Sequence, residues 1–263
     1  MSVCEQCNCY KGMGFKIKMA FQPIVQVQKK EVYAYEALVR GADGEGAGEV
    51  LARVNSDNIY SFDQTCRTTA IETASKLKMQ EKLSINFLPN AIYEPETCLE
   101  RTFRMAKKLD FPHQNIIFEV TEHERVENHS LLLEVFETYK RNGFLTTIDD
   151  FGEGYAGLNL LAEFQPDMIK LDMALIRNIH QRRVSQTILR GILSVARELE
   201  ICIVAEGVET HDEYSFLFDQ GVQLMQGYYF SKPLIEGLTN PFTQRTTRLQ
   251  DSHCASLVVP EDN

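Results

Sequence analysis

The sequence predicts an α/β fold built as an eight-stranded barrel, and two observations point to it. From residue 83 onward, short β-branched or aliphatic runs alternate with segments whose apolar residues recur at helical spacing, as in a parallel sheet crossed by helices. The strand-like runs also carry polar residues at or near their C-terminal ends, where the strands of a barrel converge on one mouth. A doubly wound open sheet is the alternative that the same alternation allows.

Hydrophobic periodicity places the individual elements. The predicted strands are 15–27, 31–40, 83–88, 115–120, 144–148, 168–171, 201–205 and 224–230. The predicted helices are 61–82, 96–109, 130–142, 155–164, 184–199 and 212–220. The first strand reads as one bent strand or a strand pair, because Pro23 lies in its middle and proline in a strand pattern indicates an edge or a bulge.

The length allows one or two domains, and single α/β barrels reach 263 residues. We expect one barrel over 15–240. A cysteine-containing tail over 1–14 precedes it, and a polar, poorly ordered tail over 241–263 follows it.

The N-terminal tail contains three closely spaced cysteines. Cys4, Cys7 and Cys9 supply three soft ligands, whereas a structural zinc site normally uses four. Cys254 or a histidine could complete such a site, but a flexible, reducible tail is the favoured interpretation.

The overall charge limits the partners of this chain. A formal net charge of -10 disfavours non-specific binding to nucleic acid, so a phosphate ligand would need metal ions or a local basic cluster. We find no run of 18 apolar residues and no apolar segment near the N-terminus, and therefore expect neither a membrane span nor a signal peptide. The expected location is cytoplasmic.

Two adjacent acids, Asp149 and Asp150, follow the strand 144–148. Adjacent carboxylates repel each other, and one of them would be driven towards protonation if no cation balanced them. Alternatively, Asp150 caps the helix expected from Tyr155. The other strand ends favour the first interpretation, because they bring further polar residues to the same mouth. These residues are Glu36, Asn86, Glu119, Lys170, Glu206 and Gln226.

Such a cluster predicts a site for hard metal ions. Buried carboxylates need cations to remain ionised, and a set of ligands made only of oxygen suits magnesium, manganese or calcium rather than zinc. The doubled aspartate suggests two metals about 3.5–4 Å apart that share a carboxylate, the geometry that hydrolyses phosphate esters. Lys170 beside this centre and Arg40 at the rim could bind a phosphate. The chemistry predicted from these residues is metal-assisted hydrolysis of a phosphodiester.

Glu36-Ala37-Leu38-Val39-Arg40 resembles the signature of the EAL domain, the bacterial cyclic di-GMP phosphodiesterase. The resemblance runs from about Phe15 to Pro233, with further motifs in the family's order. These motifs are 21–25 (FQPIV), 86–88 (NFL), 118–122 (FEVTE), 149–152 (DDFG), 170–172 (KLD), 205–209 (AEGVE) and 226–228 (QGY). The resemblance implies a modified TIM (β/α)8 barrel with an antiparallel first strand, and hydrolysis of cyclic di-GMP to linear pGpG.

The resemblance also implies metal ligands. A first magnesium or manganese ion would be held by Glu36, Asn86, Glu119 and Asp149. A second would share Asp149 and lie beside Asp150 and Glu206, bound directly or through water.

The remaining implied roles concern catalysis and substrate. Lys170 would position the nucleophilic water, Glu206 is a candidate general base, and Glu122 would brace the loop after Asp150. The residues implied to contact the substrate are Gln22, Leu38, Arg40 and Gln226. The family also commonly dimerises through the helix after that loop, which implies a homodimer.

The loop departs from the family pattern at Glu153, where threonine or alanine is usual, and at Ala156 and Gly157, where serine is frequent. An inward-pointing Glu153 would weaken phosphate binding, and we expect it to point outward. No sensory domain is recognised, so control would come from the N-terminal tail, dimerisation or a regulatory protein partner. The alternative function is a catalytically silent EAL domain that acts as a cyclic di-GMP receptor or protein switch, but the complete set of ligands favours the enzyme.

Overall fold

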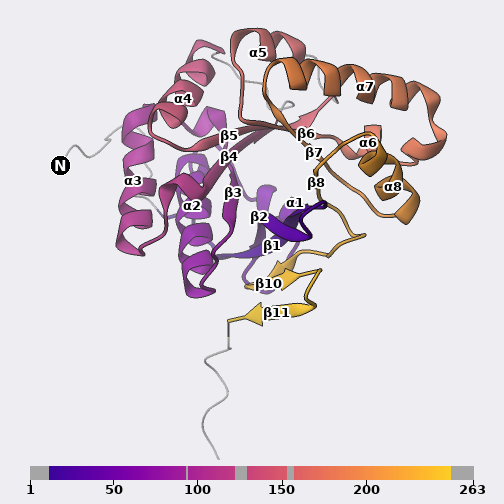
Figure 1. Ribbon diagram of the computed structural model, residues 1–263. Coiled ribbons are helices and arrows are strands. Elements are labelled where there is room, and N and C mark those ends of the chain that lie inside the picture. The colour runs from indigo at the N-terminus through magenta and orange to yellow at the C-terminus, as the bar shows by residue number, and fades with distance from the viewer. Residues whose placement is uncertain (1–11, 93, 122–128, 153–156, 250–263) are drawn as a thin grey trace, which may run out of the picture.

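The computed structural model describes residues 12–92, 94–121, 129–152 and 157–249. Figure 1 shows a strand barrel with helices packed around its outside. The barrel strands are β1 (Ile17–Gln26), β2 (Glu31–Gly41), β3 (Lys82–Asn86), β4 (Ile116–Thr121), β5 (Leu145–Phe151), β6 (Met168–Leu171), β7 (Cys202–Ala205) and β8 (Leu224–Met225). The α-helices are α1 (Ala47–Leu51), α2 (Ile59–Lys76), α3 (Pro95–Lys108), α4 (His129–Arg141), α5 (Gly157–Glu163), α6 (Met173–Ile176), α7 (Arg183–Glu198) and α8 (His211–Asp219).

The sheet closes on itself, which confirms the barrel and excludes the open sheet. Strands β2 to β8 pair in order and in parallel, and β1 joins β8 to β2 with antiparallel pairing on both sides. Pro23 falls between the part of β1 that pairs with β8, at Val25, and the part that pairs with β9 (Leu234–Ile235), at Phe21. A residue without an N–H group is tolerated at such a gap in the pairing.

Two layers of side chains fill the barrel. Alternate residues of a strand point to the same face, so each apolar residue of the inner face has a polar neighbour two positions away. The apolar layer is Ile24, Ala34, Ile117, Met168, Val204 and Leu224. The polar layer lies two residues after the apolar layer in the parallel strands and two residues before it in antiparallel β1. Its residues are Gln22, Glu36, Glu119, Lys170, Glu206 and Gln226. A larger apolar core lies between the outer face of the sheet and the helices.

Some element boundaries differ from the sequence-based prediction. The helix predicted over 61–82 ends at Lys76, because Lys78 adopts a left-handed φ of 56° and the N–H of Met79 bonds back to the Ala74 carbonyl at 3.0 Å. This is a common way to end a helix, although glycine is the usual residue there. The final strand, predicted over 224–230, contains only Leu224 and Met225. The short helices α1 and α6 were not predicted.

The C-terminal part of the described chain forms a β-hairpin of β10 (Gly237–Asn240) and β11 (Arg245–Arg248). The expected domain boundary at residue 240 therefore falls inside this hairpin. Residues 1–11 and 250–263, including Cys4, Cys7, Cys9 and Cys254, lie outside the described residues. In the part of the chain that is described, no helix has the length and hydrophobicity required to cross a bilayer.

Candidate active site

The end of β5 brings its two consecutive acids to one side of the strand. In a regular strand Asp149 and Asp150 would point to opposite faces, but the β5–β6 pairing is irregular between Ile148 and Phe151, and Asp150 has a φ of 53°. One carboxylate oxygen from each of Asp149, Asp150 and Glu206 consequently lies within 4.8 Å of the others. Helix α5 begins only at Gly157, so Asp150 is not its N-cap.

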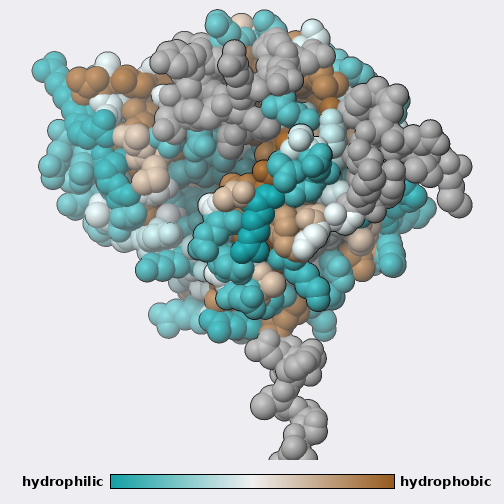
Figure 2. Space-filling model, turned by 180° about the vertical axis from the view of Figure 1, so that it is seen from behind, coloured by the Kyte–Doolittle hydropathy of each residue, from teal (hydrophilic) through white to brown (hydrophobic). Residues whose placement is uncertain are grey.

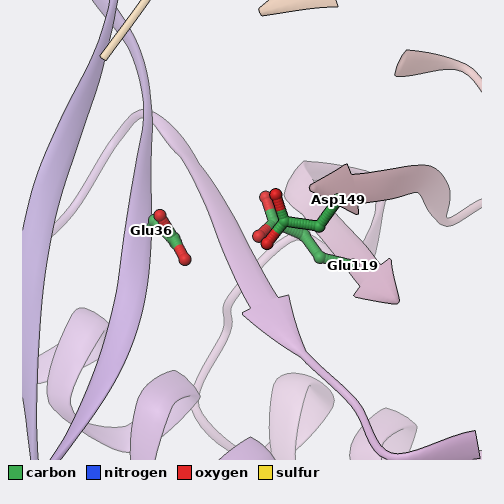
Figure 3. Close-up of side chains that lie close together, drawn as sticks. All are labelled: Glu36, Glu119 and Asp149. Atoms are coloured by element: carbon green, nitrogen blue, oxygen red, sulfur yellow. The ribbon is translucent and has the colours of Figure 1, made fainter. Parts of the chain in front are cut away.

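A second group of three acids shares Asp149. Figure 3 shows the carboxylates of Glu119 and Asp149 close together and that of Glu36 facing them from β2. One oxygen from each of these three side chains lies within 4.8 Å of the others, and all three residues are buried. The two carboxylate triads therefore share Asp149, which lies on β5, between β4 and β6 in the sheet.

Lys170 of β6 lies at the centre of the acidic residues. Its Nζ is 2.7 Å from Glu206 Oε1, 2.9 Å from Glu119 Oε2, 3.2 Å from Asp149 Oδ1 and 3.4 Å from Glu36 Oε2. Lys170 is only 1% exposed, so water does little to screen these charges. Four ionised carboxylates around one ammonium leave a formal excess of three negative charges.

The crowding of like charges changes the protonation of the site. Burial raises the pKa of Glu119 to about 8, with Lys170 opposing the rise and Glu36 and Asp149 adding to it. Burial also raises the pKa of Glu206 well above its usual value, again against the pull of Lys170. For Lys170, burial lowers the pKa, but the summed attraction of the four carboxylates outweighs it and raises the pKa well above its ordinary value. The site thus holds more acid than its own cation can keep ionised.

Two amides orient Glu36. Asn86 Nδ2 donates to Glu36 Oε1 at 3.1 Å, and Gln226 Nε2 donates to Glu36 Oε2 at 2.7 Å. Asn86 lies at the end of β3 and Gln226 directly after β8, so this carboxylate of β2 is held from both sides of its own strand. The structure therefore brings both predicted amides to the acidic cluster.

Sequence reasoning missed Ser84, which contributes to the same centre. The fully buried Ser84 hydroxyl makes a very short hydrogen bond to Glu119 Oε1, while Glu119 Oε2 faces Lys170. Ser84 precedes Asn86 by two residues on β3 and so points to the same face. The alternation of the strand was the signal that could have identified it.

The predicted substrate-binding residues are less closely grouped. Gln22 and Gln226 line a cavity of about 280 Å³ beside the acids, and Gln22 Nε2 donates to the Ser231 carbonyl at 3.2 Å. Leu38 instead lines a neighbouring, mostly apolar cavity with Asn86. Half-buried Arg40 donates to its neighbour's carbonyl, Val39 O, at 2.7 Å. Glu122 and Glu153 lie outside the described residues.

The chemistry of the ligand set suits divalent cations. The cluster offers carboxylate oxygens in two triads, carries excess negative charge and is largely buried. Hard ions such as magnesium, manganese and calcium prefer oxygen ligands of this kind. Within the described residues, no histidine or cysteine belongs to either triad.

Comparison with known proteins finds a match to the family model of the EAL domain over residues 14–233. A crystal structure of a standalone versatile EAL protein from Vibrio cholerae O395, in its c-di-GMP bound form, is 55% identical, with a TM-score of 0.82 over 85% of this chain and 94% of that one. The manganese/cy-diGMP complex of Klebsiella pneumoniae BlrP1 at pH 9.0 is 34% identical, with a TM-score of 0.81 over 86% of this chain and 58% of that one.

Curated relatives from Escherichia coli (strain K12) also match. The blue light- and temperature-regulated antirepressor BluF is 31% identical over 88% of this chain and 58% of its own length. The probable cyclic di-GMP phosphodiesterase PdeG is 35% identical over 81% of this chain and 44% of its own length. The chain thus spans about half the length of these two curated relatives.

Proposed function

The chain belongs to the EAL domain family, and we propose that it is a metal-dependent phosphodiesterase that hydrolyses cyclic di-GMP to linear pGpG. The observation that carries the proposal is the pair of carboxylate triads that share Asp149 around Lys170. A carboxylate common to two ligand groups is what a two-metal hydrolytic centre needs. The names of PdeG and of the c-di-GMP-bound Vibrio cholerae protein support the choice of substrate.

The proposed cofactors are two magnesium or manganese ions per site. Glu36, Asn86, Glu119 and Asp149 would hold the first. Asp149, Asp150 and Glu206 would hold the second. Such ions supply Lewis acidity at the phosphate oxygens and make a bound water more acidic.

The protein's own residues would bind substrate and move protons. Lys170 Nζ can donate a hydrogen bond to the attacking water or to a phosphate oxygen. Glu206 is the proposed general base, and its place beside Lys170, 2.7 Å away, supports this role. A bracing role for Glu122 stays a prediction.

Four further residues complete the proposed site. We propose that Gln22, Leu38, Arg40 and Gln226 contact the substrate. The cavity lined by Gln22 and Gln226 lies next to the acids and supports their part in this. A cytoplasmic location stays a prediction.

The direct test incubates the purified protein with cyclic di-GMP and either magnesium or manganese, and follows pGpG by chromatography. We expect product with at least one of the two metals and none after chelation. Glu36→Ala should abolish turnover because it removes a proposed ligand, whereas Glu72→Ala, on the exposed face of α2, should not change it. Absence of product with both metals would overturn the proposal.

The second candidate function is a catalytically silent receptor or protein switch. The antirepressor name of BluF favours it, because that relative is described by a regulatory role rather than by hydrolysis. Tight binding of cyclic di-GMP without product in the same assay would establish this alternative. The presence of every proposed metal ligand favours the enzyme instead.

We further propose a homodimer. The resemblance implied an interface on the helix after the loop, which is α5, but the exposed apolar surface of α7 leads us to propose the interface there. Val184 is 74% exposed, Ile188 49% and Val195 42%, at a spacing that places them on one side of the helix. Figure 2 shows hydrophobic residues gathered along the upper edge over α7. Ile188 also lines a cavity with Gly152, two residues after Asp150, so this surface is connected to the site.

Light scattering after size-exclusion chromatography tests the dimer. Ile188→Lys should convert a dimer to a monomer, whereas Ala162→Lys, on exposed α5, should not. A monomeric wild-type protein would refute the dimer, and dissociation by the α5 variant alone would place the interface on that helix instead.

A further inference from the structure

A second group of charged residues is fully buried outside the acidic site. Asp63 and Arg67 lie one turn apart on α2, Tyr139 lies on α4, and all three are at most 2% exposed. Arg67 Nε is 2.8 Å from Asp63 Oδ2, and Arg67 Nη1 donates to Tyr139 Oη at 2.7 Å. None of them lines the cavity beside the acids or belongs to either carboxylate triad.

This group lies directly behind two of the proposed metal ligands. The guanidinium carbon of Arg67 is 5.1 Å from the ring centroid of Phe118 and 5.6 Å from that of Phe87. Phe118 precedes Glu119 on β4, and Phe87 follows Asn86 at the end of β3. Because neighbouring strand residues point to opposite faces, a shift of either ring would move the adjacent ligand inside the barrel.

Hydrogen bonds also fix the backbone at this point. The N–H of Leu88, two residues after Asn86, donates to Asp63 Oδ1 at 3.0 Å. The N–H of Phe87 donates to the Glu119 carbonyl at 2.9 Å, which ties the end of β3 to β4. One charged pair on α2 thus holds the backbone at the end of β3 and contacts the rings beside both ligands.

Fold stability alone does not explain this arrangement. Replacing a buried ion pair by well-packed apolar residues is often neutral or stabilising, because the charges lose their hydration. The hydrogen bonds from Arg67 to Tyr139 and from Leu88 to Asp63 are, however, more directional than apolar packing and favour one arrangement of the neighbouring groups. The network is therefore better suited to fixing the positions of strand ends than to strengthening the core.

We propose that Asp63, Arg67 and Tyr139 are positioning residues that hold the ends of β3 and β4 so that Asn86 and Glu119 meet Glu36 and Asp149 at the spacing that binds a divalent cation. The inference rests on the proposed metal site but not on hydrolysis. It predicts that metal affinity depends on a charge pair that belongs to neither carboxylate triad, although Asp63 lines the cavity of Leu38 and Asn86. Residues that support metal ligands typically change affinity by about 10- to 100-fold when they are replaced.

The test compares two ion pairs on the same helix. Asp63→Asn/Arg67→Met removes both buried charges and keeps an acceptor for Leu88. Glu72→Gln/Lys76→Met removes an exposed pair of the same spacing, 2.8 Å between Lys76 Nζ and Glu72 Oε1. Calorimetric titration with manganese, without nucleotide, should show binding weakened about tenfold for the first variant and unchanged for the second.

Activity gives an independent readout. If hydrolysis is present, the manganese concentration for half-maximal rate should rise in Asp63→Asn/Arg67→Met, while the rate at saturating manganese is largely retained. A folded variant that binds manganese like the wild type would overturn the inference. If this double variant does not fold, Tyr139→Phe, which keeps the ion pair, should still weaken manganese binding, and unchanged binding would overturn it.

The outcomes separate this inference from the proposed function. Wild-type protein that binds manganese but yields no pGpG would reject the enzyme and leave the positioning network testable by titration. Wild-type protein that binds no manganese would reject the metal site and the positioning network together.

Discussion

The apolar and polar layers inside the barrel lie two residues apart along the strands and differ in polarity, in charge and in what their burial costs. The apolar layer, with Ile117 and Met168, gains free energy by burial, at about 25 cal/mol per Å² of apolar surface. The polar layer is largely buried too, but three of its carboxylates, together with that of Asp149, surround the single ammonium of Lys170. Buried charges cost several kcal/mol each unless they are well paired.

Inside the barrel, the apolar layer therefore serves mainly stability and the polar layer mainly function. The apolar layer needs nothing from outside the chain, whereas the polar layer is balanced only when further cations bind. A change in the apolar layer should therefore reduce stability and spare chemistry, and removal of one carboxylate from around Lys170 should do the reverse. Four substitutions test this difference between the layers.

The largest expected effect is on turnover. Asp149→Asn keeps the shape of the residue shared by both triads but removes its charge, so hydrolysis should fall by at least about a thousandfold, a loss of roughly 4 kcal/mol in transition-state stabilisation. The melting temperature of the metal-free protein should not fall, because one of four mutually repelling carboxylates has become neutral. A clear loss of stability instead would show that the polar layer also supports the fold.

The next effect concerns the cation of the polar layer. Lys170→Met should destabilise the metal-free protein by about 3–5 kcal/mol, because it leaves buried carboxylates without their partner. Manganese should recover much of this loss, since a ligand that binds only the folded state stabilises it. Chemical denaturation with and without manganese measures both. Equal destabilisation in the two conditions would show that metal and lysine do not balance the same charges.

The apolar layer should respond in the opposite way. Ile117→Ala should cost about 3 kcal/mol of unfolding free energy through lost burial and a cavity. Turnover per folded molecule should change little, because the side chain does not reach the acids. Ile235→Ala, at an exposed position on β9, is the matched control and should leave stability nearly unchanged. A Ile117→Ala protein that is stable but inactive would contradict the separation of the layers.

The smallest effect tests whether burial by itself explains the raised pKa values at the mouth. Glu213 of α8 is also fully buried, and burial acts to raise its pKa, but backbone N–H groups of Asn178, Glu209 and Thr210 outweigh this and lower it. Since the folded pKa is depressed, its stabilisation is present above the unfolded pKa, about 4.3, and is lost as pH falls through the folded pKa.

Glu213→Gln should accordingly cost about 2 kcal/mol at neutral pH. The difference from wild type should shrink below about pH 4. Denaturation across this range measures it, and a pH-independent difference would show that the charge of Glu213 does not matter. Glu213 thus differs from Glu119 because backbone donors outweigh the effect of burial on its pKa, whereas burial and neighbouring carboxylates outweigh the donors of Glu119.

Local patterns in the sequence determined the barrel fold and most of the residues of the candidate site. Alternation of strands and helices predicted the barrel, and the strand-end positions of Glu36, Glu119 and Lys170 predicted that distant residues would meet. These inferences succeeded because strand periodicity and the convergence of parallel strands are set by the backbone, whatever the details of packing.

Only the tertiary structure decided where the chain departs from regular geometry. The left-handed turn at Lys78 ended a helix whose hydrophobic pattern continued, and the irregular pairing at Asp150 placed two adjacent acids on one side of their strand. The hydroxyl of Ser84 and the guanidinium of Arg67 gained their roles from partners 35 and 72 residues away. Such features depend on long-range contacts that overcome local preference, and a periodic pattern carries no information about which distant partner a side chain will find.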